Sequence, residues 1–107
     1  MNTITTVAVL GAGQMGAGIA HIVALGGYTV RLYDVAAGRA TLALGEVATS
    51  LARHVGRGLV EQQEADAALA ALQIADRRAD AVRGADLVIE ATLETEGAQK
   101  AVFANLT

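Results

Sequence analysis

A glycine-rich turn constrains this chain more than any other feature of its sequence. It reads Gly11-Ala12-Gly13-Gln14-Met15-Gly16 and directly follows a short apolar run at Thr6–Leu10. An almost continuous apolar run that ends in glycine is typical of a parallel strand covered on both faces. The apolar residues after the turn recur at helical spacing until Gly26-Gly27; they are Met15, Ile19, Ile22, Val23 and Leu25. The sequence therefore predicts a strand, a tight turn and a helix at the start of the chain.

A second strand is predicted at Tyr28–Tyr33, and Asp34 follows it. This acid lies 18 positions after Gly16, close to the spacing of about 20 residues in dinucleotide-binding strand–helix–strand units. In such units Gly11 would permit the sharp turn, Gly13 would leave room for a pyrophosphate, and Gly16 would let the helix approach the sheet. The helix N-terminus then presents a partial positive charge to the phosphates. The alternative is a tight turn in an α/β domain without a ligand.

Asp34 predicts which dinucleotide is bound. A carboxylate at this position accepts hydrogen bonds from the adenosine ribose hydroxyls and repels a 2′-phosphate, so NAD(H) is favoured over NADP(H). Arg31 lies inside the predicted strand and Arg39 lies five positions beyond the acid, so neither is expected to replace Asp34. The alternative for Asp34 is a solvated residue at the end of a strand.

The remaining pattern predicts a Rossmann-type α/β fold, with a parallel sheet of about four strands and an inserted helical hairpin. The hairpin would consist of helices at Ala36–Val55 and Glu61–Leu72, joined by Gly56-Arg57-Gly58. The later elements expected along the chain are a short strand at Gln73–Ala75, a helix or turn at Asp80–Gly84, a strand at Asp86–Ala91 with Leu87, Val88 and Ile89 buried, and a helix at Glu96–Leu106.

Composition excludes several classes of function. The 107 residues carry a net charge of −3, which argues against a nucleic-acid-binding surface. There is no cysteine, and His21 and His54 stand apart without a second ligand at helical spacing, so no metal site is expected. His21 is interpreted as a surface or packing residue and His54 as a residue near a helix C-terminus. Without a signal peptide or an apolar run of about 20 residues, the expected compartment is the cytoplasm and no membrane partner is expected.

On these motifs, the chain resembles the N-terminal NAD-binding domain of the 3-hydroxyacyl-CoA dehydrogenases. The resemblance rests on the glycine turn and the start of its helix (Gly11–Ala20), on Leu32–Asp34, on the hairpin and on the strand sequence ADLVIEA at Ala85–Ala91. It extends to Phe103 and so covers nearly the whole chain. It implies NAD as the cofactor, held by Gly11, Ala12, Gly13, Gln14, Met15, Gly16, Asp34 and Glu94.

The resemblance also implies an acyl-CoA partner at the hairpin. Ser50 matches a serine of the family, and Arg57 stands where the family has a lysine; an ordinary helix surface is the alternative for both. The family places another lysine five residues after the glutamate matched by Glu94. Here that position is Gln99, with Lys100 beside it, and Lys100 is interpreted as a solvated surface residue.

The family reaction, as the resemblance implies it, oxidises an (S)-3-hydroxyacyl-CoA to a 3-oxoacyl-CoA with NAD. Its general base is a histidine held by a glutamate, in a segment beyond the one seen here, and neither His21 nor His54 takes that place. We therefore expect residues 1–107 to be an incomplete NAD-binding domain, without the helical domain for substrate binding and dimerisation, with no catalytic residue and no activity alone. Two alternatives remain: the cofactor domain of another hydroxyacid dehydrogenase, or a non-catalytic nucleotide-binding module. Four strands would leave a sheet edge open, which favours a homo-oligomer.

Overall fold

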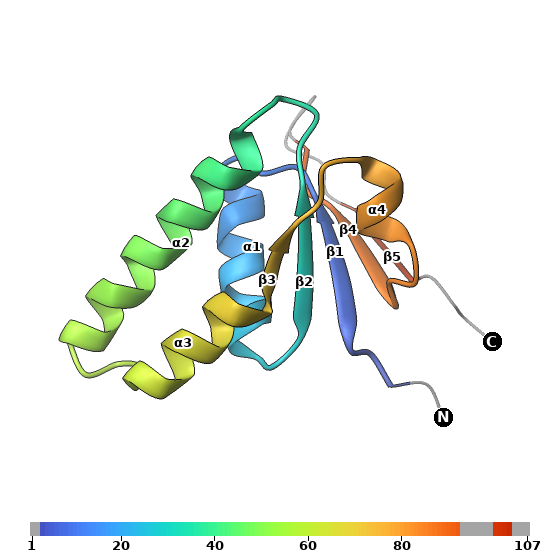
Figure 1. Ribbon diagram of the computed structural model, residues 1–107. Helices are drawn as coiled ribbons and strands as arrows, with labels where there is room; N and C mark the ends of the chain where they lie inside the picture. Colours follow the sequence, from blue (N-terminus) through green and yellow to red (C-terminus); the bar gives the residue numbers. More distant parts are fainter. Residues whose placement is uncertain (1–2, 93–99, 104–107) are drawn as a thin grey trace.

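The computed structural model describes residues 3–92 and 100–103 of the chain (Figure 1). Helices and strands follow one another in the order β1 (Thr6–Leu10), α1 (Gln14–Leu25), β2 (Thr29–Tyr33), α2 (Arg39–Gly56), α3 (Gln62–Ala71), β3 (Leu72–Ile74), α4 (Arg78–Val82), β4 (Leu87–Glu90) and β5 (Lys100–Phe103). The predicted bounds of the first helix are confirmed, since α1 ends at Leu25 immediately before Gly26-Gly27. Within the described ranges, no helix is long and apolar enough to cross a membrane.

The sheet has the strand order β3-β2-β1-β4-β5. The first four strands are parallel, and Leu10 at the end of β1 pairs with Tyr33 of β2 on one side and with Glu90 of β4 on the other. The carboxyl ends of the three central strands therefore lie at one level. The predicted Rossmann-type class is confirmed. The order of the strands reverses at β1, which lies between β2 and β4.

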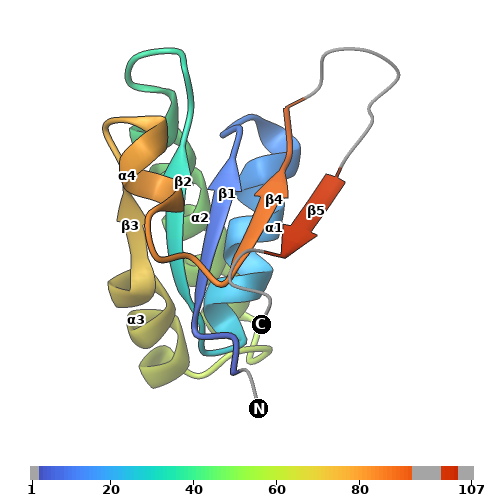
Figure 2. The same ribbon diagram turned by 90° about the vertical axis from the view of Figure 1, so that its right-hand side faces the viewer.

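The prediction of a helix at Glu96–Leu106 is wrong where the structure describes that segment. Lys100–Phe103 forms β5, which runs antiparallel to β4 with Glu90 opposite Lys100 and Leu87 opposite Phe103. The outer backbone groups of β4 need hydrogen-bond partners, and a segment with valine and phenylalanine suits a strand. The sheet therefore has five strands instead of about four, and the outer edge of β4 is paired, whereas four strands would have left it open (Figure 2).

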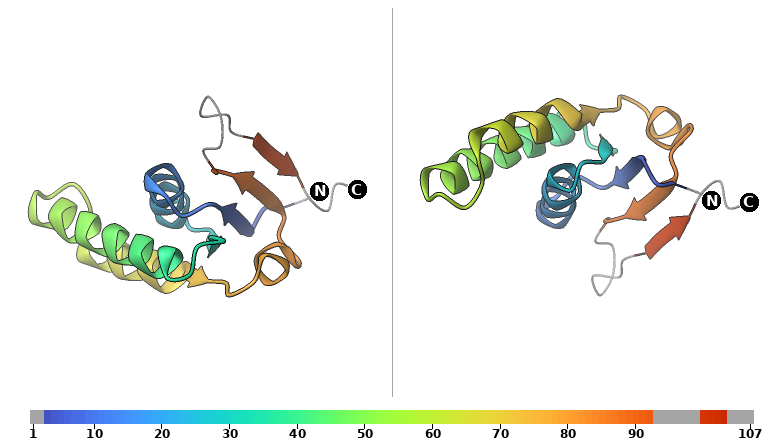
Figure 3. Two further views of the ribbon diagram at one scale, coloured as in Figure 1. Left: turned by 90° about the horizontal axis from the view of Figure 1, so that it is seen from above. Right: turned by 90° about the horizontal axis from the view of Figure 1, so that it is seen from below.

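Helices α1, α2 and α3 cover one face of the sheet, while the short helix α4 lies on the other (Figures 1 and 3). The larger core lies under α1–α3 and includes Val7 and Val9 of β1 together with Val30 and Leu32 of β2. The alternate residues Ala8 and Leu10 face α4. Both faces of β1 are thus buried, as its continuous apolar sequence predicts.

The fully buried residues of α1 are small, while Ile19, Val23 and Leu25 of the predicted apolar pattern are partly buried against the same core. Gly16, Ala17, Ala20 and Ala24 are buried, whereas Ile22 is 72% exposed. Small side chains allow close approach of the neighbouring helices and strands, and the larger residues fill the margins of that contact. In β4, Leu87, Val88 and Ile89 are half-buried, although the sequence predicts them buried. Leu87 and Ile89 pack against the core under α1–α3, and Val88 packs against the smaller cluster on the α4 side.

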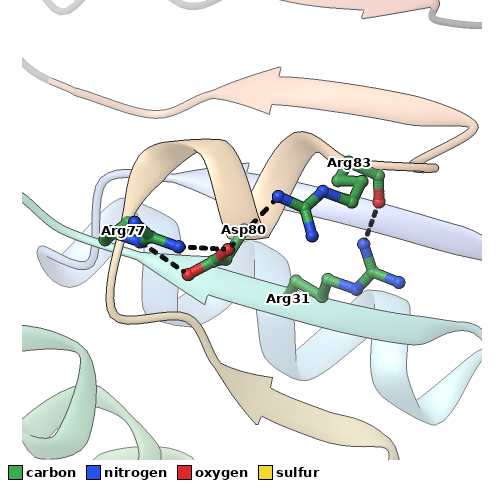
Figure 4. Close-up of polar contacts among 4 residues, drawn as sticks. All are labelled: Arg31, Arg77, Asp80 and Arg83. Carbon is green, nitrogen blue, oxygen red and sulfur yellow. Dashed lines mark hydrogen bonds and ion pairs between the residues drawn. The ribbon is translucent and has the colours of Figure 1, made fainter.

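Polar contacts within α4 and its caps, and one between β2 and the end of α4, are drawn in Figure 4. Arg77 Nε lies 3.1 Å from Asp80 Oδ2, and Arg83 Nη2 lies 3.9 Å from Asp80 Oδ1. Arg31 of β2 donates a hydrogen bond to the carbonyl oxygen of Arg83. The guanidinium of Arg31 is therefore on the α4 face of the sheet. Exposed ion pairs contribute little to stability, so the two pairs of Asp80 add little, and of the contacts drawn the hydrogen bond from Arg31 is the one that joins the end of α4 to β2.

Candidate functional site

The glycine turn lies at the carboxyl edge of the sheet, where the central strands end together. The amide of Gly11 donates to the carbonyl oxygen of Tyr33 at 2.7 Å, and the amide of Ala91 donates to that of Leu10 at 2.7 Å. The parallel ladders therefore continue one residue beyond β1 and β4. In open α/β sheets this reversal point, outside the carboxyl ends of the strands, is where ligands bind.

Two of the three glycines are required by the backbone itself. Gly11 has a φ of +110°, and a Cβ there would lie 2.9 Å from the backbone of Ala91 and Thr92. A Cβ on Gly16 would lie only 1.7 Å from the carbonyl oxygen of Gly11. Gly16 therefore lets α1 approach the turn itself, and the nearest sheet-side atom, the Cβ of Ala91, is farther away at 3.6 Å.

Gly13 is different, because the space beside it is open. A Cβ there would have just one neighbour within 4 Å among the described residues, a guanidinium nitrogen of Arg39 at 3.9 Å. Gly13 is also the N-cap residue of α1, so the cap position offers no side chain as an acceptor, and no acid occupies the first turn. An open and positively polarised helix start fits a dinucleotide diphosphate.

Asp34 reaches back to the turn. Its Oδ2 accepts a hydrogen bond from the amide of Ala12 at 2.7 Å, and its Oδ1 accepts one from the amide of Ala36 at 2.8 Å. Each carboxylate oxygen can accept more than one hydrogen bond, so both retain capacity for ribose hydroxyls. The structure thus brings Asp34 together with the glycine turn. Arg31, by contrast, extends to the carbonyl oxygen of Arg83 on the α4 face of the sheet.

A groove of about 250 Å³ runs between α1 and α2 beside the turn. It is lined by Gln14, Ala17, Gly18 and His21 of α1 and by Glu46, Val47 and Ser50 of α2. Ser50 is half-buried, whereas Arg57, the C-cap of α2, is exposed at the far end of the hairpin and does not line the groove. The structure therefore brings Ser50, but not Arg57, close to the helix that begins at the glycine turn.

The two histidines, which look isolated in the sequence, are neighbours in the structure. The ring centroids of His21 and His54 lie 5.4 Å apart at an interplanar angle of 53°. Burial, and then the charge of His54, lower the pKa of His21. Helix packing alone creates this pair, and no spacing in the sequence indicates it. Within the described ranges, no three potential metal-ligating side chains come together.

Three residues singled out in the sequence cannot be placed at the site. Glu94 and Gln99 lie outside the described residues. Lys100 is the first residue of β5 and pairs in register with Glu90. Its backbone position is therefore in a strand, which differs from the helical position expected for it.

The family model described as 3-hydroxyacyl-CoA dehydrogenase, NAD binding domain, matches residues 6–107. This chain belongs to that family. Its cofactor is accordingly NAD, and the recognition made from the glycine turn, the hairpin and the ADLVIEA strand is confirmed.

Curated relatives and solved structures agree with this assignment. The chain is 39% identical over 103 residues to a 3-hydroxybutyryl-CoA dehydrogenase of Bradyrhizobium diazoefficiens, covering 96% of this chain and 35% of the relative. It is 41% identical over 106 residues to a 3-hydroxyadipyl-CoA dehydrogenase of Escherichia coli, covering 99% of this chain and 22% of the relative. The structure of an (S)-3-hydroxybutyryl-CoA dehydrogenase from Ralstonia eutropha matches with a TM-score of 0.81 and 32% identity, over 87% of this chain and 32% of that one. The chain thus spans about a fifth to a third of the length of these proteins.

The glycine geometry predicts opposite effects for two alanine substitutions in α1. Gly16→Ala should destabilise the domain by roughly 3 kcal/mol or more, because its Cβ would overlap the Gly11 carbonyl oxygen and strain the turn. Gly18→Ala, at a position with no atom within 4 Å, should stabilise it by about 0.5–1 kcal/mol. Urea unfolding followed by circular dichroism measures both, and equal stabilities for the two variants would contradict this account.

The histidine pair predicts a pH dependence of stability. The pKa of His21 in the folded protein is lowered from about 6.5, so the unfolded chain binds more protons below neutral pH and the free energy of unfolding falls as the pH falls. His21→Gln should flatten this slope between pH 7.5 and 5. The carboxyl of Asp80 does not contribute to this slope. Its hydrogen bond with Arg77 lowers its pKa from the ordinary 3.8, so it titrates below this pH range. Urea unfolding across this range would give parallel slopes for both proteins if His21 were not responsible.

Proposed function

We propose that this chain supplies the cofactor domain of an enzyme that oxidises (S)-3-hydroxyacyl-CoA to 3-oxoacyl-CoA with NAD. The observation that carries the proposal is the placement of the Asp34 carboxylate against the glycine turn, with its Oδ2 2.7 Å from the amide nitrogen of Ala12. An acid and the open side of Gly13 thereby lie at the same reversal point of the sheet. Bound NAD supplies the hydride acceptor, and the residues of this chain bind and orient it.

Each part of the turn has a separate proposed role. The backbone from Gly11 to Gly16, including Ala12, Gln14 and Met15, surrounds the diphosphate, which approaches over Gly13. Asp34 binds the adenosine ribose and repels a 2′-phosphate. The amide of Ala12 already donates to Asp34, so this hydrogen bond orders the turn before the cofactor arrives. For Glu94 we propose a contact to the nicotinamide half of NAD, on the family resemblance alone.

The groove beside the turn supports an acyl-CoA partner. Ser50 lines it together with Gln14, which opens α1, so a thioester lying along α1 would have its reactive end near the cofactor. Arg57 at the exposed end of the hairpin is placed to meet a CoA phosphate with a guanidinium fork. We further propose a cytoplasmic homo-oligomer in which another segment provides the general base, a role in fatty acid metabolism, and no turnover by residues 1–107 alone.

The selectivity of Asp34 is testable with two cofactors. Asp34→Ala should weaken NADH binding to the 107-residue chain by about tenfold or more, since a charge-assisted contact to the ribose is lost. The substitution also loosens the turn by removing the acceptor for Ala12 and Ala36, but that cost applies equally to NADPH. The ratio of the two affinities, from fluorescence titration, is therefore the readout. An unchanged ratio would contradict the role of Asp34.

The acyl-CoA partner is testable at the hairpin. Titration of the ¹⁵N-labelled chain with CoA should shift the backbone amide signals around Ser50 and Arg57, and Ser50→Ala should weaken binding severalfold. Thr49→Ala is the matched control, because the Thr49 hydroxyl already donates a hydrogen bond to the carbonyl oxygen of Gly45 at 3.0 Å. If CoA moved no hairpin signal while NADH still bound, a hydroxyacid dehydrogenase acting on free acids would be the better interpretation.

A further inference from the structure

Arg39 reaches the cofactor site although it lies five residues beyond Asp34. Its Nη2 is 3.9 Å from the place that a Cβ on Gly13 would take, which puts the guanidinium beside the opening of the glycine turn. The side chain is half-buried. The guanidinium of Arg39 therefore lies beside Gly13, the one glycine of the turn whose surroundings are otherwise open.

The backbone fixes this position. Arg39 is the first residue of α2, and Gly38 before it has a left-handed conformation with a φ of +79°. The amide of Arg39 donates to the carbonyl oxygen of Ala36 at 3.1 Å, and the adjacent Ala40 is buried in the main core. These contacts fix the backbone from which the Arg39 side chain extends to Gly13.

The positive charge of Arg39 is not matched by an acid in the described part of the chain. No ion pair joins it to a carboxylate there, and the oxygens of the nearby Asp34 accept backbone amides of Ala12 and Ala36 instead. A half-buried arginine with no carboxylate partner among the described residues, beside a helix N-terminus whose first turn holds no acid, is suited to a bound anion.

We propose that Arg39 is a ligand of the cofactor diphosphate and sets much of the affinity for NAD(H). The inference rests on the proposed cofactor site. It adds a positively charged side chain to that site, where Asp34 and the glycines supply none. The diphosphate is favoured over the 2′-position because the guanidinium lies at Gly13, where the phosphates must cross the backbone. In this arrangement Asp34 binds the ribose hydroxyls.

The test uses the 107-residue chain with Arg39→Gln, Arg39→Lys and, as a matched control, Arg53→Gln. Arg53 is an exposed residue of the same helix, about 21 Å along its axis from Arg39. Arg39→Gln should weaken NADH and ADP binding by about five- to twentyfold and reduce the salt dependence of both affinities. Arg39→Lys should recover part of the loss, and Arg53→Gln should leave both affinities unchanged. Adenosine, which lacks the diphosphate, should bind all four proteins equally, as measured by NMR titration.

The outcomes separate this inference from the proposed function. If the wild-type chain failed to bind NADH, the cofactor site itself would be overturned. If it bound NADH and Arg39→Gln bound it equally well, only the role of Arg39 would be overturned. A loss confined to NADPH would assign Arg39 to a 2′-phosphate, and a loss shared by adenosine would assign it to the adenine ring; either result contradicts the proposal. Thermal unfolding confirms that each variant is folded.

Discussion

The contact between Gly16 and the carbonyl oxygen of Gly11 is the constraint on which the rest of the site depends. With a side chain at position 16, a Cβ would lie 1.7 Å from that oxygen, so α1 could not leave the turn in its present direction. That direction aims the N-terminus of α1 at the carboxyl edge of the sheet and lays its small residues over the core. The proposed anion-binding property of the turn is therefore a consequence of close packing, and a single methyl group would remove both.

Asp34 connects this turn to the next strand. Its carboxylate accepts amides from Ala12 and Ala36, and therefore links the glycine turn to the turn that leads into α2. The same group is the proposed ligand of the ribose, so binding and local order are coupled in one side chain. A site ordered before the ligand arrives loses less conformational entropy on binding. The second turn also determines where α2 begins, and with it the position of Arg39.

The sequence predicts the parts of this structure that depend on local rules. Gly11, Gly16 and Asp34 are identified by spacing because turn geometry demands particular residues at fixed separations. Ile22 shows the limit of periodicity: it matches a helical pattern, yet it is exposed because the helix packs through alanine and glycine. Local sequence does not predict the strand β5, because its formation depends on pairing with the free edge of β4, outside its own segment. The His21–His54 contact and the return of Arg39 to Gly13 are likewise tertiary, and no local spacing encodes them.

The small residues of α1 also bear on how the two proposed ligands would share one edge of the domain. Because Ala17 and Ala20 are short, α2 can pack close beside α1, and the groove between them begins next to Gln14 at the turn. The far side of that groove carries Ser50, while the beginning of the same helix carries Arg39. One helix therefore carries the proposed ligand of the diphosphate, Arg39, and, about 16 Å farther along its axis, the Ser50 hydroxyl that lines the groove. A change in the packing of α2 on α1 would alter both sites together, so the two binding affinities should respond jointly to substitutions at this helix contact.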